Sequence, residues 1–195
     1  MIFDRILSDF ILTERLVLRR FKEDDVEDVF ALMSDDYICR WAGIPTFKTP
    51  ERAWDFMYDW WGNAYAITER GGDDKVIGLI QLPIDLFNRR VKFGYWLAAE
   101  YRGKGYMSEV VETLVERIFE DEGMSWCEEI EIDVFLGNEA SRNVALKCGF
   151  FPQYEEFKEC IYSPYGSVES EECFLITRGD YEWRLRGEAS YSTAA

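Results

Sequence analysis

A short basic loop at residues 101–107 is the strongest candidate for chemistry in this chain; it reads Tyr-Arg-Gly-Lys-Gly-Tyr-Met. Its two glycines allow successive backbone N–H groups to turn toward a single anion. A strongly periodic helix follows, and its first turn adds unpaired N–H groups and the positive end of the helix dipole. The loop therefore predicts a phosphate or pyrophosphate site.

Three known loop types can hold such a group, and the residues separate them. The pattern GxxxxGK[ST] of nucleotide-binding P-loops is absent from the sequence. The dinucleotide pattern GxGxxG fails because Ser108 stands where the third glycine belongs. The acyl-coenzyme A loop, [QR]xxGx[GA], matches at Arg102 and Gly105 but departs at Met107, where a small residue is usual. A plain strand-to-helix turn stays open as the alternative.

The absence of histidine limits the catalytic chemistry of the chain. Without histidine there is no Ser-His-Asp triad, no Cys-His pair and no HExxH zinc site. A general base must therefore be a carboxylate, a tyrosine, a lysine, a terminal amine or a water.

Composition bounds the class of protein. The chain has 195 residues, of which 48% are hydrophobic, so we expect one folded domain with a substantial core. The net charge of −16 repels nucleic acid and anionic lipid and favours cationic small molecules or basic peptides. No apolar run reaches the roughly 20 residues of a membrane span. The first residues do not read as a signal peptide, and five cysteines without a CxxC pair predict reduced thiols. These features predict a cytoplasmic protein.

Strand and helix patterns alternate along the chain, which predicts an α/β fold. We expect a single domain over residues 1–186, followed by a disordered tail at 187–195. Helices are predicted at 26–33, 50–61, 107–119 and 138–149. Strands are predicted at 15–20, 64–69, 76–82, 91–98, 129–134, 157–162 and 171–177.

Three segments, in this order, resemble the GNAT N-acetyltransferase superfamily, and within it the RimJ/RimL-like branch that acetylates the N-termini of ribosomal proteins. They are Thr-Glu-Arg-Leu-Val-Leu-Arg at 13–19, the segment 94–109 that holds the loop, and 138–150, which begins Asn-Glu-Ala-Ser and ends Lys-Cys-Gly-Phe. The resemblance implies a GNAT fold: a mixed, mostly antiparallel central sheet of about seven strands, splayed at the cofactor site and flanked by about four helices.

The resemblance also implies acetyl-CoA as cofactor, held between the strands at 91–98 and 129–135. Backbone around Trp96, Leu97 and Ala98 would pair with the pantetheine amides. The pyrophosphate would lie on the loop formed by Arg102, Gly103, Lys104, Gly105, Tyr106 and Met107.

Two residues at the start of the helix at 138–149 receive roles from the same resemblance. Asn138 would form a hydrogen bond with pantetheine, and Ser141 would lie near the departing thiolate. Asn143 is a weaker candidate for a contact at the same end of the cleft. Helix capping is the simpler explanation for Asn138 and Ser141. The tyrosine that many relatives use as general acid is replaced by Ala145, which leaves Ser141 or a water. Asp133 is the candidate base, with a solvated surface acid as its alternative, and Glu131 is the poorer choice.

The function implied is direct transfer of acetyl from acetyl-CoA to a primary amine, without a metal or a covalent enzyme intermediate. The acceptor is either a protein N-terminal amine or a small cationic amine. A non-catalytic acyl-CoA sensor or assembly subunit is the alternative, and a homodimer is expected by analogy with the branch. Several aromatic residues are candidates for the acceptor pocket, although core packing is the commoner role: Tyr37, Trp41, Trp60, Trp61 and Phe87.

Overall fold

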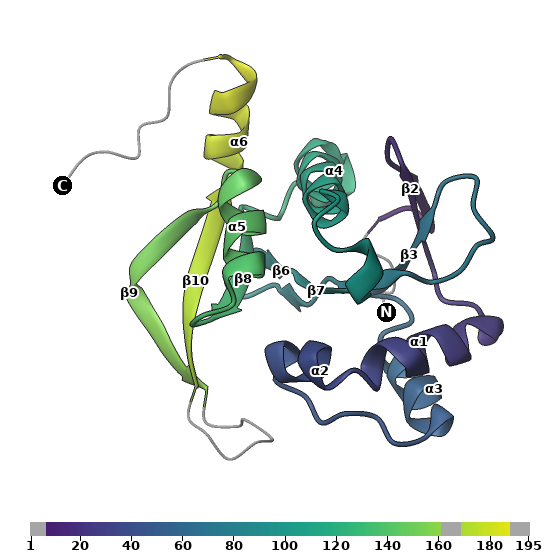
Figure 1. Cartoon of the computed structure of the whole chain (residues 1–195). Helices are drawn as coiled ribbons and strands as arrows, with labels where there is room; N and C mark the ends of the chain where they lie inside the picture. Colours follow the sequence, from purple (N-terminus) through teal and green to yellow (C-terminus); the bar gives the residue numbers. More distant parts are fainter. Residues whose placement is uncertain (1–6, 161–168, 188–195) are drawn as a thin grey trace.

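The computed structural model describes residues 7–160 and 169–187. Within these residues the chain forms ten β-strands in two five-stranded sheets, with six α-helices around them (Figure 1). The α/β class predicted from the sequence is confirmed. The expected count of about seven strands and four helices is too low, because several short strands and two short helices carry only weak periodicity.

The first sheet has the order β1-β2-β3-β4-β7, and all its pairs are antiparallel. Three helices lie together on one side of it (Figure 1) and bury a separate apolar cluster that includes Val29, Phe56 and Leu79. The strands are β1 Phe10–Leu12, β2 Leu16–Arg19, β3 Ala64–Glu69, β4 Gly78–Gln81 and β7 Gly94–Leu97, and the helices are α1 Val26–Met33, α2 Asp36–Ala42 and α3 Pro50–Asp59.

The second sheet has the order β5-β6-β8-β10-β9, in which β6 and β8 run parallel. Helix α4 packs its apolar stripe into the main core, which extends to Val144 and Ala145 on α5 and to Cys148 at the C-cap of that helix. The strands are β5 Ile84–Asp85, β6 Arg90–Lys92, β8 Glu129–Phe135, β9 Phe151–Cys160 and β10 Glu169–Thr177, and the helices are α4 Tyr106–Glu120, α5 Glu139–Lys147 and α6 Arg178–Leu185.

The two sheets separate within the strand predicted at 91–98. Strand β6 pairs with β8, and the Phe93 N–H still donates to the Glu131 carbonyl at 2.8 Å. From Gly94 onward the chain instead pairs antiparallel with β4 of the first sheet. One predicted strand is therefore two strands in different sheets. Beyond Phe93 the β7 segment leaves β8, which produces the splay expected between these segments.

The remaining differences from prediction have local causes. The four predicted helices correspond to α1, α3, α4 and α5, whereas α2 and α6 were missed. The apolar patterns of both helices are short, and the clearer signal is the residue that caps each N-terminus. The Asp35 side chain accepts backbone N–H groups in the first turn of α2, and Thr177 forms a capping box with Asp180 at the start of α6. Strand β9 begins at Phe151, earlier than the predicted 157. Residues 161–162 and the predicted tail beyond Gly187 lie outside the described residues.

Four cysteines, Cys39, Cys127, Cys148 and Cys173, are free and buried, as expected for reduced thiols, while the side chain of Cys160 lies outside the described part. Burial raises the pKa of Cys39 to about 11 and that of Cys148 to about 12. These two thiols therefore stay protonated and are poor nucleophiles. Among the helices described, none is both long and apolar enough to cross a membrane.

The close approach of β4 to β7 depends on Gly78. A Cβ at this position would lie 2.5 Å from the Trp96 backbone oxygen, a contact that only a backbone shift can relieve. We expect Gly78→Ala to lower the free energy of unfolding by about 2 kcal/mol, measured by chemical denaturation. Gly94→Ala on the facing strand is the matched control, because its Cβ would meet only ordinary contacts from 3.5 Å. Equal losses in the two variants would contradict this explanation.

Candidate active site

A cleft of about 460 Å³ opens where the two sheets separate. Strands β7 and β8, helix α2 and the N-terminal turns of α4 and α5 all contribute to its walls. Of the predicted site residues, Ala98 and Lys104 do not line the cleft. Those that do are Trp96, Leu97, Arg102, Gly103, Gly105, Tyr106, Met107, Asp133, Asn138, Ser141 and Asn143.

The glycine loop at one end of the cleft has the geometry of an anion cradle. Gly103 and Gly105 have φ angles of 72° and 78°, a region that disfavours residues with a Cβ. Within the described chain, the N–H groups of residues 103–108 form no backbone hydrogen bond, so they are open to an external acceptor. The Met107 side chain is largely buried in the main core, although Met107 also lines the cleft.

The N-terminal motif at 13–19 holds this loop in place. The Arg15 side chain donates from Nε to Glu109 on α4 at 2.7 Å and from Nη1 to the Lys104 carbonyl at 2.9 Å, while Thr13 Oγ1 donates to the same carboxylate. Burial favours a higher pKa for Glu109, but the hydrogen bonds from Thr13 and Arg15 outweigh it and lower that pKa. The Glu109 carboxylate therefore remains ionised and anchors the loop to α4.

Positive charge gathers around Gly105 in a strongly acidic protein. A Cβ on Gly105 would lie 3.5 Å from Arg15 Nη2 and 3.9 Å from Lys147 Nζ, and Lys147 also lines the cleft. Arg15 lies 90 positions before Gly105 and Lys147 lies 42 after it, so no local pattern around the loop indicates either residue. Together with open N–H groups, these cations suit a phosphate group.

Arg102 has a different set of contacts from those expected of a loop cation. Its Nε donates to the Leu97 carbonyl at 2.9 Å, and its guanidinium lies 4.6 Å from the centre of the Tyr37 ring. Its Nη2 atom lies 3.8 Å from Asp35, the N-cap of α2. Arg102 therefore braces the end of β7 against α2.

Strand alternation decides which β7 amides face the cleft. Phe93 donates toward β8, whereas the Ala98 N–H donates to the Ile77 carbonyl, on the side of β4. Because the hydrogen-bonding direction alternates along a strand, the amides of Tyr95 and Leu97 face the cleft, and those of Trp96 and Ala98 face β4. Of the three residues named for backbone pairing, Leu97 directs its amide into the cleft, whereas Trp96 and Ala98 direct theirs toward β4. Pairing of this backbone with pantetheine stays a prediction.

Asn138 and Ser141 meet at the N-terminus of α5. The Asn138 side chain accepts from the Ser141 N–H at 3.2 Å, so it caps the helix while lining the cleft. The Ser141 hydroxyl lies 2.9 Å from the hydroxyl of Tyr95. Tyr95 belongs to the 94–109 motif, but the sequence patterns gave its side chain no role. Ala145, one turn further along, is fully buried and offers no polar group.

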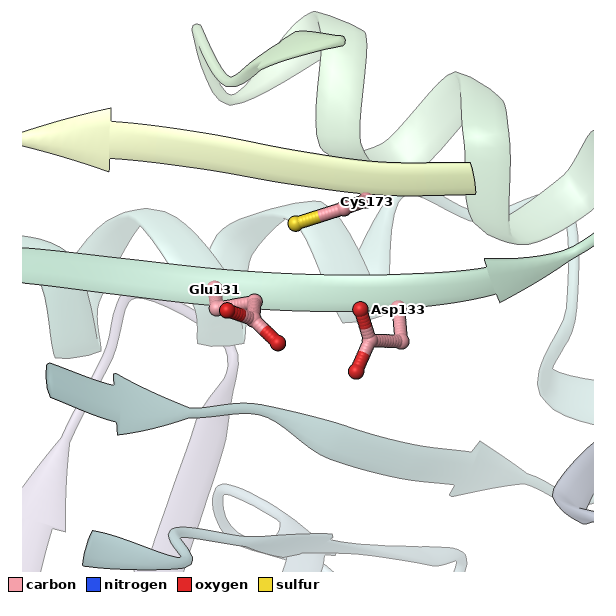
Figure 2. Close-up of side chains that lie close together, drawn as sticks. All are labelled: Glu131, Asp133 and Cys173. Atoms are coloured by element: carbon pink, nitrogen blue, oxygen red, sulfur yellow. The ribbon is translucent and has the colours of Figure 1, made fainter. Parts of the chain in front are cut away.

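The predicted polar face of β8 is less exposed than expected. Glu131 is fully buried and forms ion pairs with Arg90 and Lys92, and Lys92 Nζ also lies 3.1 Å from Asp133. Figure 2 shows Glu131 and Asp133 side by side, near Cys173 on the neighbouring strand. The carboxylates already contact two side-chain cations, so we read this cluster as an ion-pair network. Asp133 is half-buried and reaches the cleft, whereas Glu131 does not line it.

The parts of the cleft wall that come from α2 and β10 carry aromatic and acidic side chains. Tyr37 and Trp41 on α2 line the cleft and form an edge-to-face pair with ring centres 6.3 Å apart. Glu171 on β10 also lines it. The other three predicted aromatics, Trp60, Trp61 and Phe87, do not line this cleft.

A sheet split beside a helix N-terminus, with an anion-binding loop at the split, is typical of the acyltransferase class. The chain belongs to the GNAT acetyltransferase family, whose acetyltransferase (GNAT) domain matches residues 15–151. It is 31% identical over 150 residues to the uncharacterized N-acetyltransferase YoaA of Bacillus subtilis, covering 71% of this chain and 80% of that protein.

Two solved structures share the fold. The spermidine N-acetyltransferase of Vibrio cholerae in complex with CoA and spermine has a TM-score of 0.71 and 17% identity, over 86% of this chain and 98% of that chain. The ribosomal L7/L12 α-N-protein acetyltransferase RimL in complex with coenzyme A has a TM-score of 0.72 and 18% identity, over 86% and 97%. At such identities the likeness concerns the fold alone.

Proposed function

We propose that this protein transfers an acetyl group from acetyl-CoA to a primary amine. The observation that carries the proposal is the cleft between β7 and β8, with the open N–H groups of residues 103–108 at one end. Acetyl-CoA fits this cleft chemically: Gly103 and Gly105 leave room for a pyrophosphate, and Arg15 and Lys147 supply positive charge. The cleft-facing amides of Tyr95 and Leu97 would pair with the pantetheine chain.

Transfer requires one proton to leave the amine and one to reach the sulfur. The amine nitrogen forms a bond to the acetyl carbon as the carbon–sulfur bond breaks. We assign removal of the amine proton to Asp133, directly or through a water, because its half-buried carboxylate reaches the cleft. Ser141 would donate a hydrogen bond to the departing thiolate, as it lies at the N-terminus of α5, and a water would supply the proton that reaches the sulfur. A thiol pKa of about 8.5 makes this sulfur a fair leaving group.

The aromatic and acidic lining of the cleft suits a cationic amine as acceptor. Trp41 offers aromatic surface beside Tyr37, whose ring already contacts Arg102, and Asp133 and Glu171 add carboxylates on a chain of net charge −16. A protein N-terminal amine, with a pKa of about 8, is roughly one tenth neutral at pH 7, so a weak base is sufficient for it. The RimJ/RimL-like resemblance favours such an N-terminus, and the overall charge favours a small cationic amine.

A binding protein without catalysis is the second candidate. The observation that favours it is the buried Ala145 in the place of the tyrosine acid that many relatives use. Such a protein would bind acetyl-CoA equally well and release no thiol with any amine. A homodimer stays a prediction; β9 forms an edge of the second sheet, where strand pairing between two copies would occur.

The test combines binding with turnover. We expect isothermal titration to show acetyl-CoA binding, and thiol release to rise with at least one member of a panel of ribosomal N-terminal peptides and polyamines. Binding without thiol release would favour the sensor, and no binding at millimolar acetyl-CoA would overturn both functions.

Ser141→Ala tests the assignment of the leaving-group donor. We expect kcat to fall about tenfold, because one hydrogen bond to a charged sulfur is lost, while KM for acetyl-CoA changes by less than about twofold. Ser125→Ala, on an exposed turn after α4, is the control and should retain both constants. An unchanged kcat for Ser141→Ala would remove Ser141 from the reaction.

A further inference from the structure

A pair of hydroxyl groups lies between the two sides of the cleft. Tyr95 extends from β7 and Ser141 from α5, and their oxygens are 2.9 Å apart. Both residues line the cleft, and the Tyr95 ring packs against the main core. A tyrosine on the diverging strand thus reaches the residue expected beside the thioester sulfur.

We propose that Tyr95 is a positioning residue that donates its hydroxyl proton to Ser141 Oγ and so directs the serine O–H toward the sulfur of bound coenzyme A. This inference rests on the proposed function. It gives the protein a hydroxyl arrangement in place of the tyrosine that is missing at Ala145.

The distance between the two hydroxyl oxygens allows either to be the donor. A phenol is a stronger donor than an alcohol, and an alcohol oxygen is the better acceptor, so we assign the donation to Tyr95. The Ser141 carbonyl lies farther from the Tyr95 hydroxyl, at 3.4 Å, and is the weaker acceptor. Once its oxygen accepts from Tyr95, the serine hydroxyl keeps its own proton for a second partner. The Ser141 N–H is already occupied by Asn138, which fixes the serine backbone.

Burial supports this role. It raises the pKa of Tyr95 well above its ordinary value, so the hydroxyl remains protonated and available as a donor. The same shift means that Tyr95 does not give up its proton. No proton is transferred between the two residues, and Tyr95 acts only through the orientation of Ser141.

The first experiment measures binding and needs no turnover. We compare dissociation constants for coenzyme A and desulfo-coenzyme A, which has hydrogen in place of the thiol, by isothermal titration at pH 8. We expect the wild type to bind coenzyme A about fivefold more tightly than the desulfo compound, the size of one hydrogen bond. In Tyr95→Phe and in Ser141→Ala this preference should fall below about twofold, with the desulfo affinity unchanged. If Tyr95→Phe keeps the wild-type preference for coenzyme A over desulfo-coenzyme A, the proposal is overturned.

The second experiment is a double-mutant cycle on kcat with the best amine of the panel. Tyr95→Phe should lower kcat about fivefold with KM for acetyl-CoA unchanged, and the double variant should be no slower than Ser141→Ala alone. If the losses of kcat caused by the two single substitutions multiply in the double variant, Tyr95 acts independently of Ser141 and the proposal is overturned.

Tyr65→Phe is the matched control for loss of a buried tyrosine hydroxyl. Tyr65 is fully buried and donates to the Ser8 carbonyl at 2.8 Å, outside the cleft. This variant should retain the wild-type kcat and preference for the thiol. A wild type that binds coenzyme A with the thiol preference but acetylates no amine would contradict the proposed function and still support the hydroxyl pair.

Discussion

Gly105→Val is expected to raise the dissociation constant of acetyl-CoA about 100-fold, equivalent to about 2.7 kcal/mol. Gly105 has a φ of 78° as the N-cap of α4, and a β-branched residue is strongly disfavoured there. The loop would either relax and turn its N–H groups away or place methyl groups between Arg15 and Lys147, where we expect the phosphate. Isothermal titration with acetyl-CoA measures the loss.

Gly71→Val separates this effect from backbone strain. Gly71 has a nearly identical φ of 79° in the turn between β3 and β4, and a Cβ there meets nothing within 4 Å. Both variants should lose about 1–2 kcal/mol of stability. Only Gly105→Val should lose acetyl-CoA affinity; a comparable loss in Gly71→Val would mean that strain, rather than the loop, weakens binding.

Asp25→Ala is expected to lower the free energy of unfolding by about 3 kcal/mol or more, measured by chemical denaturation. Arg19, the last residue of the 13–19 motif, is buried and makes a two-pronged contact with Asp25 at 2.7 and 2.8 Å. The same carboxylate accepts the Lys22 N–H at 2.7 Å. Removing it leaves the Arg19 guanidinium largely desolvated and without its buried partner.

Asp74→Asn provides the comparison for the same arginine, because Asp74 has a φ of 65° and asparagine, unlike alanine, tolerates that backbone. Asp74 accepts from Arg19 Nε at 2.8 Å, but its side chain is 48% exposed. An exposed carboxylate contributes little, so we expect a loss of about 1 kcal/mol or less. Equal losses in the two aspartate variants would show that burial is not the reason for the larger effect.

Some features of the site follow from local sequence alone. Glycines at 103 and 105 before a helix with a clean apolar stripe predict an anion-binding turn, because positive φ angles and helix periodicity are properties of a few adjacent residues. The cap at Asn138 is equally local, and the structure shows it accepting the Ser141 N–H.

Other features depend on which segments become neighbours. The alternation of Glu131 and Asp133 with apolar residues predicted an exposed polar face, yet Glu131 is fully buried beside Arg90 and Lys92. The parallel pairing of β6 with β8 brings those cations together with Glu131, and no pattern within a single strand reports its partner.

Contiguous residues were sufficient to predict the family, the α/β class, four of the six described helices and the glycine loop, because each of these depends on short local patterns. Three features required the folded chain: the switch of sheets at Phe93, the hydrogen bond from Arg15 to Glu109, and the contact of Tyr95 with Ser141. These contacts join residues 38 to 94 positions apart. The packing of the whole core brings these residues together in space, and no short sequence pattern encodes that packing.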